Sequence, residues 1–524
     1  MTRVQRPASR RPGIHQTTGS PPAAKPGVAA GADGRPIGGP GDQDLLDHHT
    51  KLTGSDLRAP SSTRRVDQPG ARARIDLRHW QPEQLKRVFL EDIRRSFDLL
   101  KRLPPAVTFF GGARIKPDDP YYALARELGR LLATASIPPR TGGGPGIMTA
   151  VPEGYKTANP TPVPDAIAFH PLVSGFSEQA AVDDTRTQAF SIILPYEQKI
   201  ADAIDVAEEI AQFPYRKAAL YENARGLVTF PGGYGTLDEL FEVWTRGVRG
   251  RHHDPMVVVG SEFWGPVLGA VEEVAVRQRG LIKASEWSQM KMADQPAAIL
   301  GHLASADNVR GFETDPEAEA AAMGREIASA VETLARLPTA VTFIGGHLLP
   351  ATASECGVAR EAARLLTRAG VPTRVGGNAA VAEAVAVGTR AARPSAEVQG
   401  FIIKSDDTGR QIDGLKIHMA VDESITHKEL IGRRCRAFVA LPGGLCTLAE
   451  LFSVLTQIQC GMIEKVPILL VGSSYWRPIF DAIKAQMLDG PRQTIAPEDL
   501  DMVTITDDPA VIARAVADAG GRAT

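Results

Sequence analysis

The stretch VTFPGGYGTLDELFEV (Val228–Val243) occurs a second time, as VALPGGLCTLAELFSV (Val439–Val454). In each version a short apolar run is followed by a glycine turn and then by apolar residues at helical spacing. This pattern is typical of a buried strand that leads through a tight loop into a helix. The second version has Cys446 where the first has Gly235. The chain therefore contains two copies of one unit, and the copies differ at the loop.

Two further matches extend the duplication along both halves of the chain. LPPAVTFFGG (Leu103–Gly112) matches LPTAVTFIGG (Leu337–Gly346), which lies 234 positions later, and TGGGPGIM (Thr141–Met148) matches VGGNAAVA (Val375–Ala382) at the same offset. At the PGG loops the offset is 211, so the first copy carries 23 extra residues between its two glycine loops. The constant order of the motifs indicates that a whole domain was duplicated.

The apolar runs AVTFF, GLVTF and MVVVG show no polar alternation, and segments with helical spacing separate them. Strands of this kind are typical of a parallel sheet that helices cover on both faces. We therefore predict an α/β protein with two tandem Rossmann-like, doubly wound parallel-sheet domains, at residues 77–305 and 315–524. Residues 1–76 are rich in Pro, Gly, Ala and Arg, which predicts a disordered tail, with a basic arm for a partner as the alternative.

Composition argues against several classes of function. The chain has 59 basic and 61 acidic side chains, so no strong net charge attracts nucleic acid or an anionic membrane, and small molecules are the expected partners. No apolar run is long enough to span a membrane, which predicts a soluble protein. The four cysteines lie in the second half without a CxxC pair, which indicates a reduced, cytoplasmic chain without a zinc site. The Arg-rich start lacks the apolar core of a secretory signal, although an organelle transit peptide stays open.

Two glycine loops of the first copy are suited to binding a phosphate group. Both follow a predicted strand and lead into a helix, where backbone N–H groups and the helix dipole favour an anion. The candidate phosphate-binding residues are Gly142, Gly143, Gly144 and Gly146 in the first loop and Gly232, Gly233, Gly235 and Thr236 in the second. The first loop is not a dinucleotide fingerprint, because Ile147 stands where G-x-G-x-x-G requires glycine, and a simple tight turn is its alternative.

Glu239 and Arg216 are the candidates for chemistry in the first copy. Thr236 and Glu239 also fit a capping box, in which both side chains would satisfy the start of their own helix. Arg216 precedes Glu239 by 23 positions, and the equivalent residue of the second copy is His427. The copy that lacks this arginine also lacks Gly235, which favours one shared site over two unrelated positions.

Four motifs of the first copy occur together in a fixed order. They are GGGPGIM (Gly142–Met148), LPYEQ (Leu194–Gln198), YRK (Tyr215–Lys217) and PGGYGTLDE (Pro231–Glu239). This set resembles the LOG family of cytokinin riboside 5′-monophosphate phosphoribohydrolases, in particular the bacterial branch that includes nucleoside-monophosphate nucleosidases. Some members of that family were once labelled lysine decarboxylases. The resemblance covers most of residues 85–305.

The resemblance implies a Rossmann-like fold and hydrolysis of the N-glycosidic bond of a nucleoside 5′-monophosphate, AMP-like or a cytokinin ribotide, to free base and ribose 5-phosphate. It implies that Arg216 and Glu239 are catalytic. Lys217 is placed with the phosphate-binding residues, and Gly112 and Glu197 are candidate substrate contacts. The resemblance implies no metal, pyridoxal phosphate or other cofactor. It does imply dimers, which in this chain means a homo-oligomer or an intrachain pseudo-dimer of the two halves. A nucleotide or cofactor carrier on the same fold is the alternative, and the missing G-x-G-x-x-G argues against a dehydrogenase.

The chemistry of a ribosyl C–N bond agrees with these roles. Its cleavage develops oxocarbenium charge on the sugar, which a carboxylate at Glu239 can stabilise while it accepts a proton from water. The planar fork of Arg216 is suited to orienting that carboxylate or to binding the phosphate.

The second copy is similar to the same family over residues 337–480, but it differs from the family motifs at the decisive positions. GGGPGIM has become GGNAAVA, Arg216 has become His427, and Gly235 has become Cys446. We expect Cys446 to strain a loop that needs a positive φ angle, and its Cβ atom to crowd a bound phosphate. The second copy is therefore expected to be inactive, as a pseudo-dimer partner or a regulatory nucleotide-binding half. A changed activity that uses His427 or a Cys446 thiol of lowered pKa is the alternative.

Overall fold

A computed structural model of the chain describes residues 81–158, 186–194, 200–251, 254–304, 315–377, 379–406, 409 and 411–520. The predicted tail at 1–76 lies outside the described residues, and so does Glu197. The strands described below fall inside the two predicted domains, whose limits stay a prediction.

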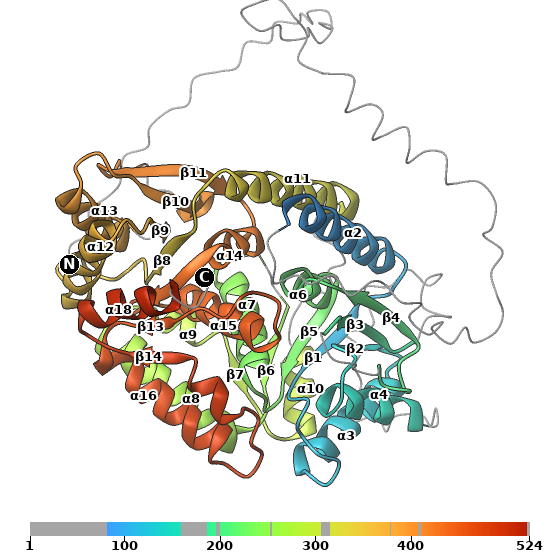
Figure 1. Cartoon of the computed structure of the whole chain (residues 1–524). Coiled ribbons are helices and arrows are strands. Elements are labelled where there is room, and N and C mark those ends of the chain that lie inside the picture. Colours follow the sequence, from blue (N-terminus) through green and yellow to red (C-terminus); the bar gives the residue numbers. More distant parts are fainter. Residues whose placement is uncertain are drawn as a thin grey trace, which may run out of the picture. The chain divides into compact units, whose positions relative to one another are not determined.

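The first half contains a seven-stranded parallel sheet in the spatial order β4-β3-β2-β1-β5-β6-β7 (Figure 1). Its strands are β1 (Ala106–Phe110), β2 (Pro139–Thr141), β3 (Gln188–Ile192), β4 (Val206–Ile210), β5 (Ala224–Thr229), β6 (Met256–Val258) and β7 (Lys291–Met292). All five residues of β1 are buried, as expected for a sheet that is covered on both faces. The strand order reverses between β1 and β5, so the carboxyl ends of these two strands flank the crevice where such folds bind ligands.

The second half repeats this topology. Its strands are β8 (Ala340–Ile344), β9 (Thr373–Gly376), β10 (Val398–Ile403), β11 (Leu415–Val421), β12 (Cys435–Ala440), β13 (Ile468–Leu470) and β14 (Val503–Ile505). They pair in the order β11-β10-β9-β8-β12-β13-β14, again all parallel. The predicted fold class, two tandem Rossmann-like parallel-sheet units, is therefore confirmed.

Helices connect the strands in each half. In the first half they are α2 (Pro82–Leu100), α3 (Pro120–Thr134), α4 (Ile147–Thr157), α6 (Phe213–Tyr221), α7 (Tyr234–Val248), α8 (Ser261–Val271), the π-helical η2 (Glu272–Gln278), α9 (Ala284–Trp287) and α10 (Pro296–Ala304). In the second half they are α11 (Pro316–Ala335), α12 (Ser354–Arg368), α13 (Ala379–Ala392), η3 (Lys404–Asp406), α14 (Ser424–Gly432), α15 (Leu445–Gln459), α16 (Ser473–Ile483), η4 (Lys484–Leu488), α17 (Pro497–Leu500) and α18 (Pro509–Gly520).

The first sheet separates two apolar cores. On one face α3, α4 and α10 pack over side chains such as Val107 and Phe109. The other face, toward α2, α6 and α7, receives Phe110 and Leu227. Phe109 and Phe110 enter different cores because successive strand residues point to opposite faces. The core that contains Phe110 also includes residues of the second half, so the two halves share one apolar interior.

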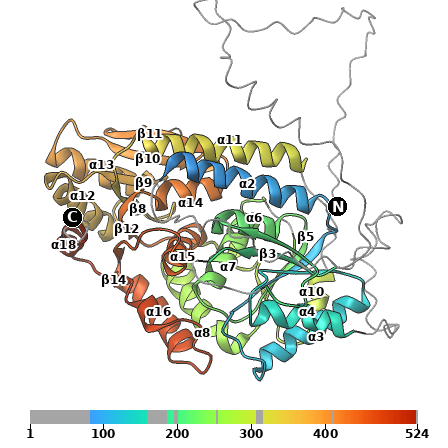
Figure 2. The same ribbon diagram turned by 45° about the vertical axis from the view of Figure 1, so that its right-hand side comes forward.

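Equivalent helices of the two halves pack against each other. In Figures 1 and 2, α2 lies beside α11, α7 beside α15 and α8 beside α16, and contacts join each of these pairs. At the centre Phe241 of α7 stacks on Phe452 of α15, with ring centroids 5.7 Å apart. Pairing of each element with its own counterpart is the geometry of a two-fold symmetric dimer. Here a single chain supplies both sides.

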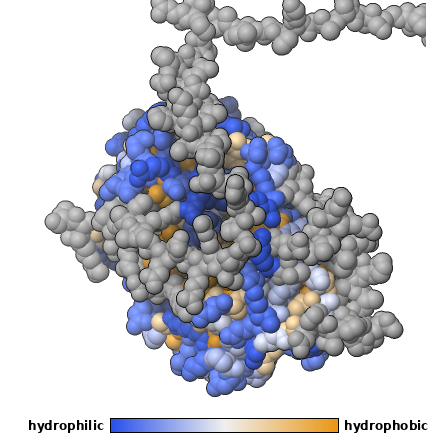
Figure 3. Space-filling model, turned by 90° about the vertical axis from the view of Figure 1, so that its right-hand side faces the viewer, coloured by the Kyte–Doolittle hydropathy of each residue, from blue (hydrophilic) through white to orange (hydrophobic). Residues whose placement is uncertain are grey.

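None of the helices in the described ranges is both long and apolar enough to cross a lipid bilayer. On the face shown in Figure 3, hydrophilic residues predominate where described residues are visible, and apolar residues are scattered between them. The large apolar side chains recorded as exposed in these ranges are Leu90, Leu348, Val387 and Ile417. Leu90 lies on α2, and the other three lie in the second half.

Candidate active site

Three glycine turns meet at the carboxyl edge of the first sheet, after β1, β2 and β5. The Gly112 N–H donates to the Pro231 carbonyl at 2.8 Å, and the Ile147 N–H donates to the Gly112 carbonyl at 3.3 Å. Gly146 has φ +71°, and a Cβ atom there would lie 2.2 Å from the Gly112 carbonyl oxygen. Glycine is therefore required at 146 to let two loops approach each other.

Arg216 and Glu239 form a buried ion pair beside these turns. Arg216 lies in α6 and Glu239 in α7, and Nη1 donates to Oε1 at 3.0 Å. Arg216 Nε also donates to the Phe190 carbonyl in β3, at 3.0 Å. Exposure is 5% for Arg216 and 6% for Glu239. The structure thus brings together the two residues predicted to be catalytic.

The first glycine loop touches this ion pair directly. A Cβ atom on Gly142 would lie 2.0 Å from Arg216 Nη2, so a larger residue would displace the guanidinium. The ring of Phe213 lies 5.1 Å from the guanidinium carbon, a favourable cation–π distance. Gly143, with φ +74°, and Gly144 follow in the same loop, and both are buried. The loop and the ion pair therefore belong to one site.

The second glycine loop closes around Thr236. A Cβ atom on Gly232 would lie 2.1 Å from Thr236 Oγ1, which explains why this position lacks a side chain. A Cβ atom on Gly233 would lie 2.6 Å from the Thr494 carbonyl oxygen, which belongs to the second half. The loop thus contributes both to the site and to the seam between the halves.

The capping-box reading of Thr236 and Glu239 is wrong for this helix. Helix α7 begins at Tyr234, two residues before Thr236, and no side chain caps it. The Glu239 carboxylate bonds to Arg216 instead. The Glu239 side chain therefore pairs with Arg216 and does not cap its own helix.

Burial raises the pKa of Glu239 to about 7. The positive charges of Arg216 and Lys217 act against this rise, and the negative charge of Asp238 adds to it. A carboxyl group with a pKa near neutrality can both accept and release a proton under ordinary conditions, as a general base or acid requires.

Lys217 lies in a network of buried charges at the seam. Its Nζ is 2.7 Å from Asp238 Oδ1 and 3.8 Å from Glu242 Oε2. Glu242 also binds Lys428 of the second half and accepts a hydrogen bond from Ser424 Oγ at 2.9 Å. Two carboxylates therefore engage Lys217, and its assignment to phosphate binding stays a prediction.

His427 of the second half occupies the place of Arg216. Its Nδ1 lies 3.2 Å from Glu450 Oε1, and its Nε2 lies 3.2 Å from the Phe401 carbonyl. Glu450 is the equivalent of Glu239, and Phe401 of Phe190. The imidazole thus reproduces both contacts of the arginine, but these contacts use both of its nitrogens.

Cys446 fits its position without strain, contrary to the expectation from the sequence. The equivalent Gly235 is part of helix α7, has no positive φ angle, and a Cβ atom there would meet nothing closer than 3.8 Å. A side chain is therefore tolerated. Burial raises the pKa of the Cys446 thiol, although Arg249 lowers it, which argues against the alternative of a reactive thiolate.

The sequence reasoning missed two residues at the ends of the central helices. Arg249 follows α7 and reaches into the second half, where Nη2 donates to Cys446 Sγ at 3.4 Å. Cys460 holds the equivalent position after α15, packs with Phe213 and interacts electrostatically with Arg216. Each half thus places one residue at the site of the other. Comparing the copies at the 211-residue offset would have found this exchange of arginine for cysteine.

The fold defines a tandem Rossmann-like protein with two parallel-sheet units. The family model described as "Possible lysine decarboxylase" matches residues 175–303 and 380–516, together just over half of the chain. The chain therefore belongs to this family, and the two matched segments agree with a tandem copy.

Curated relatives carry the name cytokinin riboside 5′-monophosphate phosphoribohydrolase. The one from Mycobacterium marinum is 42% identical over 65 residues, which cover 12% of this chain and 32% of the relative. The one from Rhodococcoides fascians is 27% identical over 175 residues, covering 33% of this chain and 77% of the relative. In the Mycobacterium marinum and Mycobacterium tuberculosis relatives, the match spans about a third of the relative's length or less.

Solved structures with a similar arrangement include a molybdenum cofactor binding protein from Rippkaea orientalis. It is 17% identical, covers 38% of this chain and 94% of its own length, and has a TM-score of 0.24. A molybdenum cofactor carrier protein from Chlamydomonas reinhardtii is 18% identical, with coverages of 38% and 98% and a TM-score of 0.24.

Proposed function

We propose that the first half hydrolyses the N-glycosidic bond of a nucleoside 5′-monophosphate, AMP-like or a cytokinin ribotide, to free base and ribose 5-phosphate. The observation that carries the proposal is the buried Arg216–Glu239 pair at the edge where the glycine loops meet. The names of the curated relatives support the same reaction.

In the proposed reaction the phosphate lies against the backbone N–H groups of the two glycine loops, where helix starts favour an anion. The C1′–N bond breaks, its electron pair leaves with the base nitrogen, and positive charge develops on the ribose. The Glu239 carboxylate stabilises this charge. Water adds to C1′, Glu239 accepts one proton from it, and one proton is delivered to the base. Nucleotide and water thus become free base and ribose 5-phosphate.

Arg216 has a positioning role in this reaction. Its guanidinium bonds the Glu239 carboxylate and the Phe190 carbonyl at once, which fixes the direction of the carboxylate. Its positive charge also limits how far burial raises the pKa of Glu239, so that the ionised form is available near neutrality.

A nucleotide or cofactor carrier is the second candidate. A carrier needs loops that bind a phosphate but has no use for a buried carboxylate with a pKa near 7. The placement of Glu239 beside Arg216 therefore favours hydrolysis over transport.

The test is a turnover assay on the purified full chain. AMP, CMP, GMP, UMP and prenyl-AMP are offered separately, and free base and ribose 5-phosphate are measured. Glu239→Gln is expected to lower the rate by about a hundredfold to ten-thousandfold, whereas Glu450→Gln is expected to leave it unchanged. Binding without base release in all three proteins would support the carrier. Loss of turnover in Glu450→Gln alone would place the active site in the second half.

A further inference from the structure

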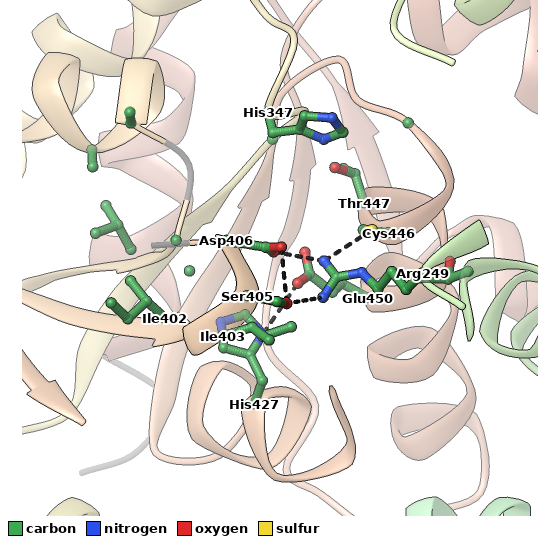
Figure 4. Close-up of a pocket in the computed structure, with 18 of the residues that line it drawn as sticks. Arg249, His347, Ile402, Ile403, Ser405, Asp406, His427, Cys446, Thr447 and Glu450 are labelled. Atoms are coloured by element: carbon green, nitrogen blue, oxygen red, sulfur yellow. Dashed lines mark hydrogen bonds and ion pairs between the residues drawn. The ribbon is translucent and has the colours of Figure 1, made fainter. Parts of the chain in front are cut away.

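The second half contains a cavity of about 940 Å³ at the carboxyl edge of its sheet. Gly376 and Gly377 at the end of β9 line it, as do the first residues of α15 and the pair His427–Glu450 (Figure 4). Its volume falls within the range of roughly 300–1,000 Å³ that is usual for small-molecule sites. The half expected to be inactive therefore has room for a ligand of nucleotide size.

One part of this cavity is suited to an anion. Helix α15 begins at Leu445 with no side-chain cap, and Thr447 in its first turn lines the cavity. The backbone N–H groups of a first helical turn attract negative charge. His347 lies close to Thr447 in Figure 4 and adds a further polar group.

Arg249 brings a positive charge to the same place from the first half. Its guanidinium points between Cys446 and Asp406 in Figure 4, and Nη2 lies 2.6 Å from Asp406 Oδ2. The Asp406 side chain is 39% exposed and lies in the short helix η3, so it can turn into solvent when another anion approaches Arg249. Two further carboxylates line the cavity: Glu450, which is held by His427, and Glu286, which accepts a hydrogen bond from the Lys283 N–H.

Another part of the cavity wall is apolar. It is formed by Val375, Ala382, Ile402, Ile403, Leu415 and Ile417. In Figure 4, Ile402 lies away from His347 and Thr447, across the cavity from them. A nucleotide fits both parts, because it carries a phosphate at one end and a base with apolar faces at the other.

We propose that the second half binds a nucleoside monophosphate without hydrolysing it, and that Arg249 of the first half contacts its phosphate in place of Asp406. Turnover is not expected, because His427 stands in the position of Arg216 and both of its nitrogens are engaged. The nucleotide class rests on the proposed function, but the binding site does not require that the first half hydrolyses anything.

The position of Arg249 makes this site specific to the second half. The equivalent residue, Cys460, lies beside Arg216 and Phe213 in the first half and carries no positive charge. The two sites therefore differ in how they receive the phosphate, and a substitution at Arg249 changes only one of them.

The test measures binding of AMP to the full chain carrying Glu239→Gln, by equilibrium dialysis. Two AMP molecules per chain are expected. Adding Arg249→Ala is expected to weaken the affinity of one of the two sites for AMP by about tenfold or more. Adding Arg251→Ala, which removes an arginine outside the cavity, is expected to leave the affinity of both sites unchanged. Adenosine, which lacks the phosphate, is expected to bind the Arg249-dependent site at least about tenfold more weakly than AMP.

Equal binding in the Arg249→Ala and Arg251→Ala chains, or a single site that neither change affects, would overturn the proposal. Ile417→Asp provides a second variant should Arg249→Ala fail to fold, because Ile417 is 44% exposed and lies on the cavity wall. It is expected to weaken the same site, and full retention of both sites would again count against the proposal. Absence of base release from the unsubstituted chain, together with an Arg249-dependent site, would refute only the proposed function.

Discussion

Arg216 and His427 make the same two contacts from equivalent positions of the two halves. Each reaches a glutamate on the central helix and a backbone carbonyl of the neighbouring strand. The guanidinium has five N–H donors, whereas a doubly protonated imidazole has two. The substitution therefore preserves the packing of the pair and removes the donors that remain for a ligand.

We expect Arg216→His to imitate the second half and to lower kcat by about a hundredfold or more. The imidazole can reach Glu239 and the Phe190 carbonyl, so the fold should persist, and the unfolding midpoint provides the control for this. Steady-state kinetics on the best nucleotide of the panel gives the measurement. Activity within about threefold of the unsubstituted chain would show that the guanidinium itself is not needed.

The pH dependence of turnover should follow the ionisation of the Glu239 carboxylate. Glu239 must be ionised to accept a proton, and burial raises its pKa to about 7. The value of kcat/KM is therefore expected to rise with pH through about 7 and to level off above it. Asp238→Asn removes a negative charge that raises this pKa, so the midpoint of the profile should move to lower pH. A profile that is flat from pH 5 to 9 would contradict the assignment of Glu239 as the base.

Gly142→Ala tests whether the first loop and the ion pair form one site. The added Cβ atom would lie 2.0 Å from Arg216 Nη2 and must displace the guanidinium. A displacement of about 1 Å in such a group typically lowers the rate by about a hundredfold. Gly269→Ala in α8, where an added Cβ atom meets nothing within 4 Å, is the matched control and should retain full activity. Equal activity of the two variants would separate the loop from the site.

Glu242→Gln should destabilise the contact between the halves. Glu242 is buried, lies within ion-pair distance of Lys217 and Lys428, and accepts a hydrogen bond from Ser424. Removing one partner of a buried ion pair costs about 3–5 kcal/mol, because the remaining charge is left uncompensated. The midpoint of urea unfolding of the full chain measures this effect. Replacing both partners, as Glu242→Leu with Lys428→Met, should recover part of the loss, and no recovery would indicate that other contacts dominate.

Much of the fold could be predicted from periodicity and duplication. The run AVTFF has no polar alternation, and it forms the buried central strand β1. The helix expected from Ile147 begins there. The start of α7 was harder to predict, because Thr236 resembles a cap but the helix already begins at Tyr234, two residues earlier. Local sequence could not distinguish a capping glutamate from a buried one, since that choice depends on an arginine 23 positions away.

The site was predictable only in part. The pairing of Arg216 with Glu239 followed from the resemblance and from comparing the copies. The contribution of Arg249 to the other half was not visible, because it depends on how two whole domains dock. The expected strain at Cys446 was wrong for a related reason: the helix starts one residue earlier than Gly235, so this glycine needs no special backbone conformation.

The packing of α7 on α15 within one chain affects how the two halves can evolve. In a dimer of identical chains, every mutation appears in both active centres, so neither can be altered alone. Here the two halves are encoded separately, so a mutation at position 249 or 460 changes a residue beside the sheet edge of one half only. Because the halves are covalently linked, they do not dissociate on dilution, and they are always present in a one-to-one ratio.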